Sequence, residues 1–178
     1  AHADAICEKP LVLNPRNLDG LAQMETDTGR RIYTIMQLRL HPAVVALRNK
    51  VSTEPTGKVH NVELTYVTRR GSWYYSSWKG DENKSGGIAT NIGVHFFDML
   101  HYVFGALQEN RVHLHEDKRA AGYLEFEHAR VRWYLSIDIE DVPAPARAKG
   151  QTTWRSITVD GKEIEFSGGF TDLHTLSY

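Results

Sequence analysis

The sequence predicts an α+β fold in which a βαβ unit precedes a mainly antiparallel sheet. Three observations lead to this prediction. Residues 3–38 follow a strand, helix, strand pattern, and β-rich segments follow one another after residue 110 with no helical pattern between most of them. The dipeptide Asp160-Gly161 then joins the last two segments in the manner of a two-residue hairpin. With 178 residues, of which 41% are apolar, the chain is long enough to bury a substantial core.

The first strand and helix are indicated by their boundaries. Residues 3–8 are short and apolar and lead into a Lys-Pro step, which is typical of a strand followed by a loop. Asn14 and Pro15 supply an N-cap and a first-turn proline, and Gly29 stands where a helix commonly ends. Residues 31–38 are β-branched, aromatic and almost continuously apolar, which indicates a strand covered on both faces.

The middle of the chain mixes helices with one long strand. A short helix is predicted from Pro42 to about Val51, and the alternation in residues 58–70 predicts a half-exposed strand. Residues 71–87 are aromatic, then polar, then glycine-rich, and have neither helical nor strand periodicity, so we expect a long loop. From Thr90 apolar residues recur at helical spacing until Gly105.

The last third of the chain reads as successive strands. A proline-bearing loop over 143–151 interrupts them. The predicted strands cover 111–116, 122–128, 129–139, 154–159 and 162–166. Both ends of the chain fall inside patterns typical of ordered structure, so the sequence is expected to be a fragment of a longer polypeptide.

Charge and composition exclude several classes of protein. The chain has 21 basic and 22 acidic residues and a formal net charge of −1, without a basic cluster of the kind that binds nucleic acid or anionic membranes. One cysteine permits no internal disulfide, and no apolar stretch is long enough to span a bilayer. Without a signal-like N-terminus, a cytoplasmic location is the prediction.

Lys9 is the first candidate for chemistry. It follows a predicted buried strand, and Pro10 can fix the direction of the chain so that the ammonium is presented at the carboxyl edge of the sheet. The alternative is a solvated lysine at the end of a strand.

Asn91 and His95 are four residues apart on the predicted helix and therefore share one face, with Asp98 near His95. A histidine can take the proton of an alcohol as hydride leaves its carbon, and the amide can hold the same oxygen. The alternative is a packed core histidine, with Asn91 belonging to the start of the helix.

Further polar and aromatic residues have two interpretations each. Gln37, Arg39 and His41 alternate on an expected strand continuation, where Arg39 can bind a carboxylate or form a structural or interface ion pair. The aromatic residues of the 71–87 segment either stack on a sugar or base, pack on their own core, or form a subunit contact; they are Trp73, Tyr74, Tyr75 and Trp78.

Two patterns argue against other sites. His113 and His115 alternate on one strand face, but a zinc site needs more ligands than they supply, so no metal is predicted. The sequence contains no G-x-G-x-x-G fingerprint, P-loop, G-x-S-x-G elbow or H-E-x-x-H motif. The chain alone therefore has no phosphate cradle.

Three segments resemble, in order and spacing, the glucose-fructose oxidoreductase and inositol dehydrogenase (Gfo/Idh/MocA) family. They are Glu8-Lys9-Pro10 with the Leu-Val-Leu-Asn that follows it, MQLRLHP at 36–42, and SGGIATNIGVHFFDML at 85–100. The resemblance covers nearly the whole chain. Within the family the sequence looks most like the UDP-N-acetylglucosaminuronate 3-dehydrogenases of bacterial surface-polysaccharide synthesis.

The resemblance implies a division of the chain and a set of partners. Residues 1–38 would be the last βαβ unit of a truncated Rossmann domain, and residues 39–178 a substrate-binding and oligomerisation domain with helices on one face of its sheet. The implied cofactor is NAD or NADP, whose main site would lie outside this chain. The implied partners are a nucleotide sugar and further copies of the chain, forming a dimer or tetramer through the open sheet face.

The resemblance also implies roles for individual residues. Lys9 and His95 would be catalytic, with His95 as the proton acceptor. Asn91 stands where many relatives carry an aspartate, and Leu38 replaces a frequent arginine. The expected substrate contacts are Asn91, Arg39, Gln37, Tyr75 and Lys79, and the expected cofactor contacts are Lys9, Glu8 and Pro10.

Three functions are compatible with these residues. The first is one part of an NAD-dependent dehydrogenase that oxidises a sugar hydroxyl, at C3 of a UDP-N-acetyl-hexuronic acid, and that is inactive as this chain alone. The second is a non-catalytic scaffold of the same fold. The third is a related dehydrogenase or reductase acting on another sugar or on a bilin-type substrate.

Overall fold

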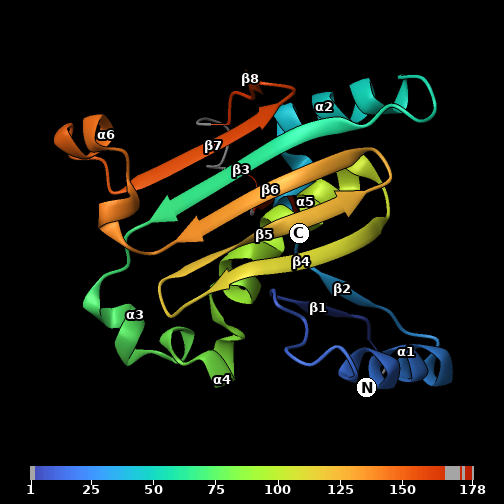
Figure 1. Ribbon diagram of the computed structural model, residues 1–178. Helices are drawn as coiled ribbons and strands as arrows, with labels where there is room; N and C mark the ends of the chain where they lie inside the picture. Colours follow the sequence, from blue (N-terminus) through green and yellow to red (C-terminus); the bar gives the residue numbers. More distant parts are fainter. Residues whose placement is uncertain (1–2, 167–172, 174, 178) are drawn as a thin grey trace.

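Two separate sheets organise the chain, as Figure 1 shows for a computed structural model that describes residues 3–166, 173 and 175–177. In the smaller sheet, β1 (Ala5–Cys7) and β2 (Ile32–Thr34) are parallel and are connected through α1 (Asn17–Thr28). The predicted βαβ order is therefore confirmed, but its strands are not buried, since Ile6 and Tyr33 are exposed. Helix α1 begins at Asn17 after Arg16 and has no side-chain cap, so Asn14 and Pro15 lie before the helix. The sequence predicts ordered structure up to residue 178, but most residues after 166 lie outside the described part of the chain.

The larger sheet has six strands in the order β4-β5-β6-β3-β7-β8. Strands β3 and β6 are parallel, and the other four neighbouring pairs are antiparallel, which confirms a mainly antiparallel sheet. Asp160 and Gly161 both have positive φ angles, at 52° and 75°, so they form the tight turn predicted between the last two strands. The strands are β3 (His60–Thr68), β4 (Leu107–His115), β5 (Arg119–Phe126), β6 (Ala129–Ser136), β7 (Thr153–Val159) and β8 (Lys162–Glu163).

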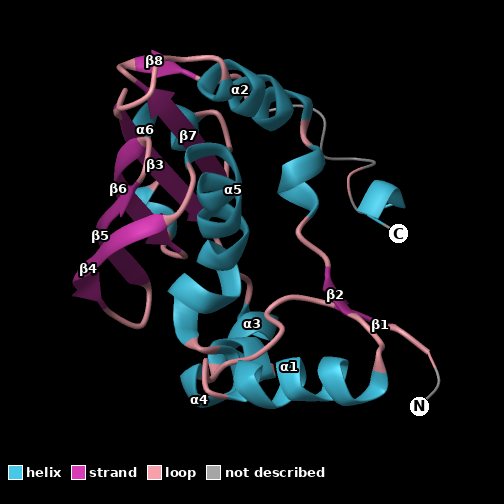
Figure 2. Cartoon of the chain, turned by 90° about the vertical axis from the view of Figure 1, so that its right-hand side faces the viewer, coloured by secondary structure: helices cyan, strands magenta, loops and turns pink. Residues whose placement is uncertain are grey.

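One face of the larger sheet forms the core. Strands β3 and β6 bury every second residue at their beginnings, as expected for strands with one covered face. Helices α2 (Pro42–Ser52) and α5 (Val94–Phe104) lie on this face, as Figure 2 shows. The side chains of Leu64, Leu100, Phe104 and Leu135 are almost completely inaccessible to solvent. Burial of each such side chain contributes about 1.5–3 kcal/mol to folding.

Helix α5 ends where the sequence places its stop. Its apolar stripe faces the sheet, and Gly105 has a φ of 86°, a conformation that favours glycine. Within the described residues no helix combines the length and the apolar character needed to cross a bilayer.

Several predicted segments were wrong in detail. Residues 71–87 contain short helical turns instead of an irregular loop, namely α3 (Ser72–Ser76), a 3₁₀ turn (Trp78–Gly80) and α4 (Glu82–Ser85). The predicted loop at 143–151 contains α6 (Ala144–Ala148). These turns are too short for a repeating apolar stripe, and side-chain caps such as those of Ser77 and Asp81 start them instead.

The predicted strand over 31–38 was also wrong at its end. Strand β2 stops at Thr34, and Gln37–Leu40 forms a 3₁₀ turn, so Gln37, Arg39 and His41 do not alternate on a strand. The turn is followed directly by α2, for which the His41 ring accepts a hydrogen bond from the Ala43 N–H. His41 itself keeps an extended backbone, so the departure from strand geometry lies in the Gln37–Leu40 turn.

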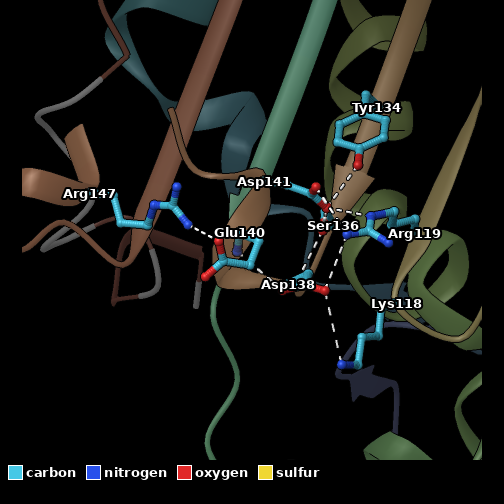
Figure 3. Close-up of polar contacts among 8 residues, drawn as sticks. All are labelled: Lys118, Arg119, Tyr134, Ser136, Asp138, Glu140, Asp141 and Arg147. Carbon is cyan, nitrogen blue, oxygen red and sulfur yellow. Dashed lines mark hydrogen bonds and ion pairs between the residues drawn. The ribbon is translucent and has the colours of Figure 1, made fainter. Parts of the chain in front are cut away.

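A second, smaller apolar cluster covers part of the opposite face of the sheet. Val67 of β3 packs there against Val142 and Ala146. The expectation that helices lie on one face only therefore holds for α2 and α5 but not for α6. Next to this cluster, the carboxylate of Asp141 accepts hydrogen bonds from Arg119 (2.6 Å) and Tyr134 (2.9 Å), as Figure 3 shows.

Replacing Asp141 by asparagine is expected to lower the free energy of unfolding by about 1–3 kcal/mol, because charge-assisted hydrogen bonds are lost. Partial burial alone would raise the pKa of Asp141, but the bonds from Arg119, Ser136 and Tyr134 outweigh it and lower the pKa. The contribution is thus present above the ordinary carboxyl pKa and disappears as the pH falls through the lowered one. Urea denaturation at several pH values measures it.

The control for this prediction is Asp117→Asn, which removes the same charge from the exposed β4–β5 turn. If both variants lost the same stability, Asp141 would have no special role.

Candidate functional site

A cavity of about 230 Å³, which we call the central cavity, lies between the residues that follow β1, helix α5 and the end of β3. Its wall combines Lys9, which follows β1, with His95 of α5 and with Tyr66 and Arg70 from β3 and the residues after it. Residues that are 86 positions apart in the sequence thus face one space, since both Lys9 and His95 line it. The resemblance implies that both residues are catalytic, and a shared cavity is what that implication requires.

The ammonium of Lys9 is held in place by the backbone of the histidine-bearing segment. Its Nζ donates a hydrogen bond of 2.5 Å to the carbonyl oxygen of Asn91. Burial lowers the pKa of Lys9, and the charges of Lys79 and Arg70 lower it further, against an opposing effect of Glu8. Lys9 is therefore a half-buried donor aimed at the cavity, not a solvated lysine.

The imidazole of His95 is uncharged at neutral pH. Burial lowers the pKa of His95 to about 4, with the charge of Lys9 as the next cause and opposing effects of Glu8 and Asp98. Its Nδ1 is buried and has no hydrogen-bond partner among the described residues. A neutral imidazole with an unoccupied buried nitrogen can accept a proton from a bound molecule.

The segment before His95 is a π-helical turn, Ala89–Gly93, and not the regular helix that the sequence predicts from Thr90. A Cβ on Gly93 would lie 2.6 Å from Phe97 Cε2 and 2.9 Å from Leu135 Cδ1, so only glycine allows this close approach to the sheet. The turn brings both Asn91 and His95 to the cavity wall. Single π turns inside helices are often found at functional sites.

Gln37 and Arg39 are separated by the 3₁₀ turn. Gln37 lines the central cavity, and its Oε1 is buried with no partner in the part of the chain that is described. Arg39 instead donates from Nε and Nη2 to Asp98, at 2.8 and 2.5 Å. This places Arg39 in the structural ion pair that was its alternative interpretation, and it does not line the cavity.

The aromatic segment divides between core and surface. Tyr74 is buried, whereas Trp73, Tyr75 and Trp78 are about half exposed. Tyr75 lines a neighbouring cavity of about 190 Å³, the side cavity, and not the central one. Lys79 lines both cavities, and its Nζ lies 5.8 Å from the centre of the Trp73 ring.

The other expected cofactor contacts lie beside the central cavity. Glu8 and Pro10 flank Lys9 but do not line the cavity, and Glu8 acts on Lys9 and His95 through its charge. The peptide bond between Lys9 and Pro10 is cis.

Sequence reasoning missed Arg70 and Arg155, which also line the central cavity. Together with Lys9 and Lys79 they make four cations, and no carboxylate lines the cavity within the described residues. The alternation of β3 could have indicated Arg70, because it continues the inward series of Tyr66 and Thr68. A cavity with this charge favours an anionic ligand.

The histidine pair considered for a metal forms no metal site in the described residues, where no group of three or more potential ligands gathers. His115 lies 3.0 Å from the carboxylate of Glu82 and lines the side cavity.

Comparison with known proteins gives consistent matches. The model for the C-terminal alpha/beta domain of the oxidoreductase family (Gfo/Idh/MocA) matches residues 48–175. The WlbA (WbpB) dehydrogenase from Thermus thermophilus, solved with NAD and alpha-ketoglutarate, is 55% identical, with a TM-score of 0.92 over 98% of this chain and 56% of its own. The same enzyme solved with NAD and UDP-GlcNAcA is 54% identical, with a TM-score of 0.91 over the same shares.

More distant structures share the fold. The WlbA dehydrogenase from Bordetella pertussis, solved with NADH and UDP-GlcNAcA, is 16% identical and has a TM-score of 0.74 over 97% of this chain and 57% of its own. The chain thus spans a little over half the length of these solved relatives. Since the family model matches most of its residues, the chain belongs to the Gfo/Idh/MocA oxidoreductase family and carries that family's C-terminal alpha/beta domain.

Proposed function

We propose that this chain is the substrate-binding part of an NAD-dependent dehydrogenase that oxidises the C3 hydroxyl of a UDP-N-acetyl-hexuronic acid. The observation that carries the proposal is the convergence of Lys9 and His95 on one cationic cavity. The likeness to a dehydrogenase solved with NAD and UDP-GlcNAcA supports the substrate class. Bacterial polysaccharide synthesis is the process that we infer for such a product.

In the proposed reaction His95 acts as the general base. Its neutral imidazole accepts the proton of the sugar hydroxyl as the hydride leaves the carbon. In the protein without substrate, burial and then the charge of Lys9 lower the pKa of His95 to about 4. An anionic substrate offsets the cations of the cavity and raises the basicity of His95 when it is needed.

Lys9 stabilises the oxygen that loses its proton. Its ammonium is fixed by the carbonyl of Asn91 and is directed to the cavity that His95 lines. A donor held in advance at the place where negative charge develops costs no reorganisation during the reaction. Asn91 and Gln37, which also line the cavity, supply neutral polar atoms that can orient the sugar.

NAD fits this arrangement through the residues that follow β1. Lys9 stands just beyond the carboxyl end of a parallel strand, the edge at which α/β sheets bind nucleotides. When bound, NAD supplies the hydride acceptor. The chain carries no glycine fingerprint, so we propose that a further NAD-binding segment completes the site. Several apolar side chains of the βαβ unit are about half exposed, and such a segment could pack against them. They include Ile6, Leu18, Met24 and Tyr33.

We further propose that copies of this chain associate through the face of the larger sheet that α2 and α5 leave uncovered. Glu63, Tyr123, Arg130 and Arg132 line a groove of about 420 Å³ on this face. The reaction and its cofactor suit the cytoplasm, which is the location that we infer.

The chain as given is expected to form no NADH when mixed with NAD and UDP-N-acetylglucosaminuronate, because it lacks the glycine-rich cradle for the cofactor. The full-length protein is expected to form NADH, which absorbance measures directly. A full-length protein that releases no NADH from any nucleotide sugar would refute the proposed function. Turnover by the chain alone would refute the proposed division of the site.

A further inference from the structure

Arg70 is placed in the wall of the central cavity by the geometry of β3. The inward series on this strand includes Tyr66 and Thr68, and Arg70 continues it two residues beyond the end of the strand. Arg69 falls on the opposite side, is exposed, and does not line the cavity. The two neighbouring arginines thus have opposite surroundings.

The guanidinium of Arg70 lacks an acidic partner within the described residues. Its Nε is buried and makes no hydrogen bond there, and the ring of Tyr74 lies 5.7 Å from its Cζ. A buried N–H group without an acceptor costs free energy, so such groups are normally satisfied.

Two other arginines of the chain have the carboxylate partner that Arg70 lacks among the described residues. Arg39 and Arg119 each donate two hydrogen bonds to one carboxylate. No carboxylate of the described residues lines the cavity that Arg70 faces. A bound molecule that carries an acceptor would satisfy the buried Nε of Arg70.

The size of the cavity indicates which part of the substrate Arg70 meets. Ligand pockets commonly have volumes of about 300–1,000 Å³. The central cavity, at about 230 Å³, encloses only part of a nucleotide sugar. The buried Nε of Arg70 belongs to this enclosed part, where Lys9 and His95 require the sugar to be.

Lys79 is another cation of the central cavity, and its charge differs in geometry from that of Arg70. Lys79 lines both the central and the side cavity, and the carboxylates of Glu82, Glu116 and Asp117 line the side cavity with it. A lysine acts on phosphate as a point charge, whereas the planar guanidinium fork matches a planar carboxylate.

From these observations we propose that Arg70 is the residue that selects the acidic sugar, by binding the carboxylate of the hexuronic acid next to the reacting hydroxyl. This proposal rests on the proposed function, since it assumes a nucleotide-sugar dehydrogenase. It adds the residue that makes the enzyme prefer a uronic acid over the neutral sugar that differs from it only at C6.

The test compares two substrates in the full-length protein, UDP-N-acetylglucosaminuronate and the neutral UDP-N-acetylglucosamine. In Arg70→Gln, kcat/KM for the acid is expected to fall by roughly 10–150-fold, because a hydrogen-bonded charge contact is lost. The value for the neutral sugar should change by less than about threefold on the same reasoning. Arg70→Lys keeps the charge without the fork and should give an intermediate loss for the acid.

The matched control is Arg69→Gln, which removes the same charge from the adjacent, outward-facing position and should leave the preference unchanged. Thermal unfolding of each variant shows whether the fold is intact. An equal loss for both sugars would mean that Arg70 holds the diphosphate or only the fold, and would overturn the proposal. An unchanged preference for the acid in Arg70→Gln would also overturn it.

Binding measured by calorimetry separates this proposal from the proposed function. If the full-length wild-type protein forms NADH with neither sugar, the proposed function fails, and the affinity for UDP-N-acetylglucosaminuronate still tests Arg70. Weaker binding of the acid to Arg70→Gln, with the neutral sugar unaffected, supports the role of Arg70. Equal affinities in wild type and variant, or no binding of the acid by the wild type, overturn it.

Discussion

Replacing His95 by asparagine in the full-length protein is expected to slow hydride transfer by about 10²–10⁴-fold, the usual contribution of a general base. Asparagine keeps a polar side chain of similar reach but cannot accept the hydroxyl proton at neutral pH. His95 lines the sugar-sized cavity and lies outside the predicted cofactor contacts, so the affinity for NAD should stay unchanged. Stopped-flow absorbance of NADH measures the transfer, and calorimetry measures NAD binding.

The pH dependence of this step follows from the same group. The base works only when uncharged, so kcat/KM should fall as the pH drops toward about 4, the value to which burial and Lys9 lower the pKa of His95 in the free protein. The part of this decline that is due to His95 should be absent from the asparagine variant.

His113→Asn provides the control for His95, because His113 is an exposed histidine of β4 that does not line the central cavity. An unchanged transfer rate in His95→Asn would remove His95 from the mechanism. A rate that fell equally in both variants would point to a general effect on the fold.

Replacing Lys9 by methionine is expected to lower kcat by about 10²–10³-fold, the effect of removing one preorganised donor to a developing oxyanion. Methionine fills a similar volume but cannot donate, and the carbonyl of Asn91 loses its partner. Lys9 lines the cationic cavity, where burial first and then the charges of Lys79 and Arg70 lower its pKa. Steady-state kinetics with saturating substrate measures the loss.

The comparison variant for Lys9 is Lys149→Met, in which an exposed lysine after α6 is changed in the same way. It should keep the wild-type kcat. A Lys9→Met protein with full activity and normal thermal stability would show that Lys9 is only a structural contact of the π turn.

Much of the fold could be predicted from local signals. Helix α2 begins at Pro42, α5 ends before Gly105, and the turn at Asp160 and Gly161 forms as their sequences indicate. These features depend on nearest neighbours, since a cap, a stop or a tight turn needs only a few adjacent residues. The resemblance to a known family identified the same family that the comparison with known proteins shows.

The details of the candidate site could not be predicted in the same way. Arg39 belongs to the MQLRLHP segment that resembles the family, but it is paired with Asp98. Arg70 belongs to no recognised motif, and it lines the central cavity. Which arginine has a partner depends on which carboxylate the tertiary structure brings to it, and Asp98 is 59 residues away from Arg39 in the sequence. The π turn at Ala89–Gly93 also needs the sheet, because Gly93 packs against Leu135 of β6.

The amino-acid sequence by itself thus determined the order of the main strands and of the three long helices, the family, and the two residues proposed for catalysis. These depend on short segments whose pattern and spacing carry the information. Only the tertiary structure decided that Lys9 and His95 share a cavity, that its charge is positive, and that Arg70 faces it. Charge pairing and burial are set by distances between residues far apart in the chain, and such distances exist only once the sheet and its helices have packed.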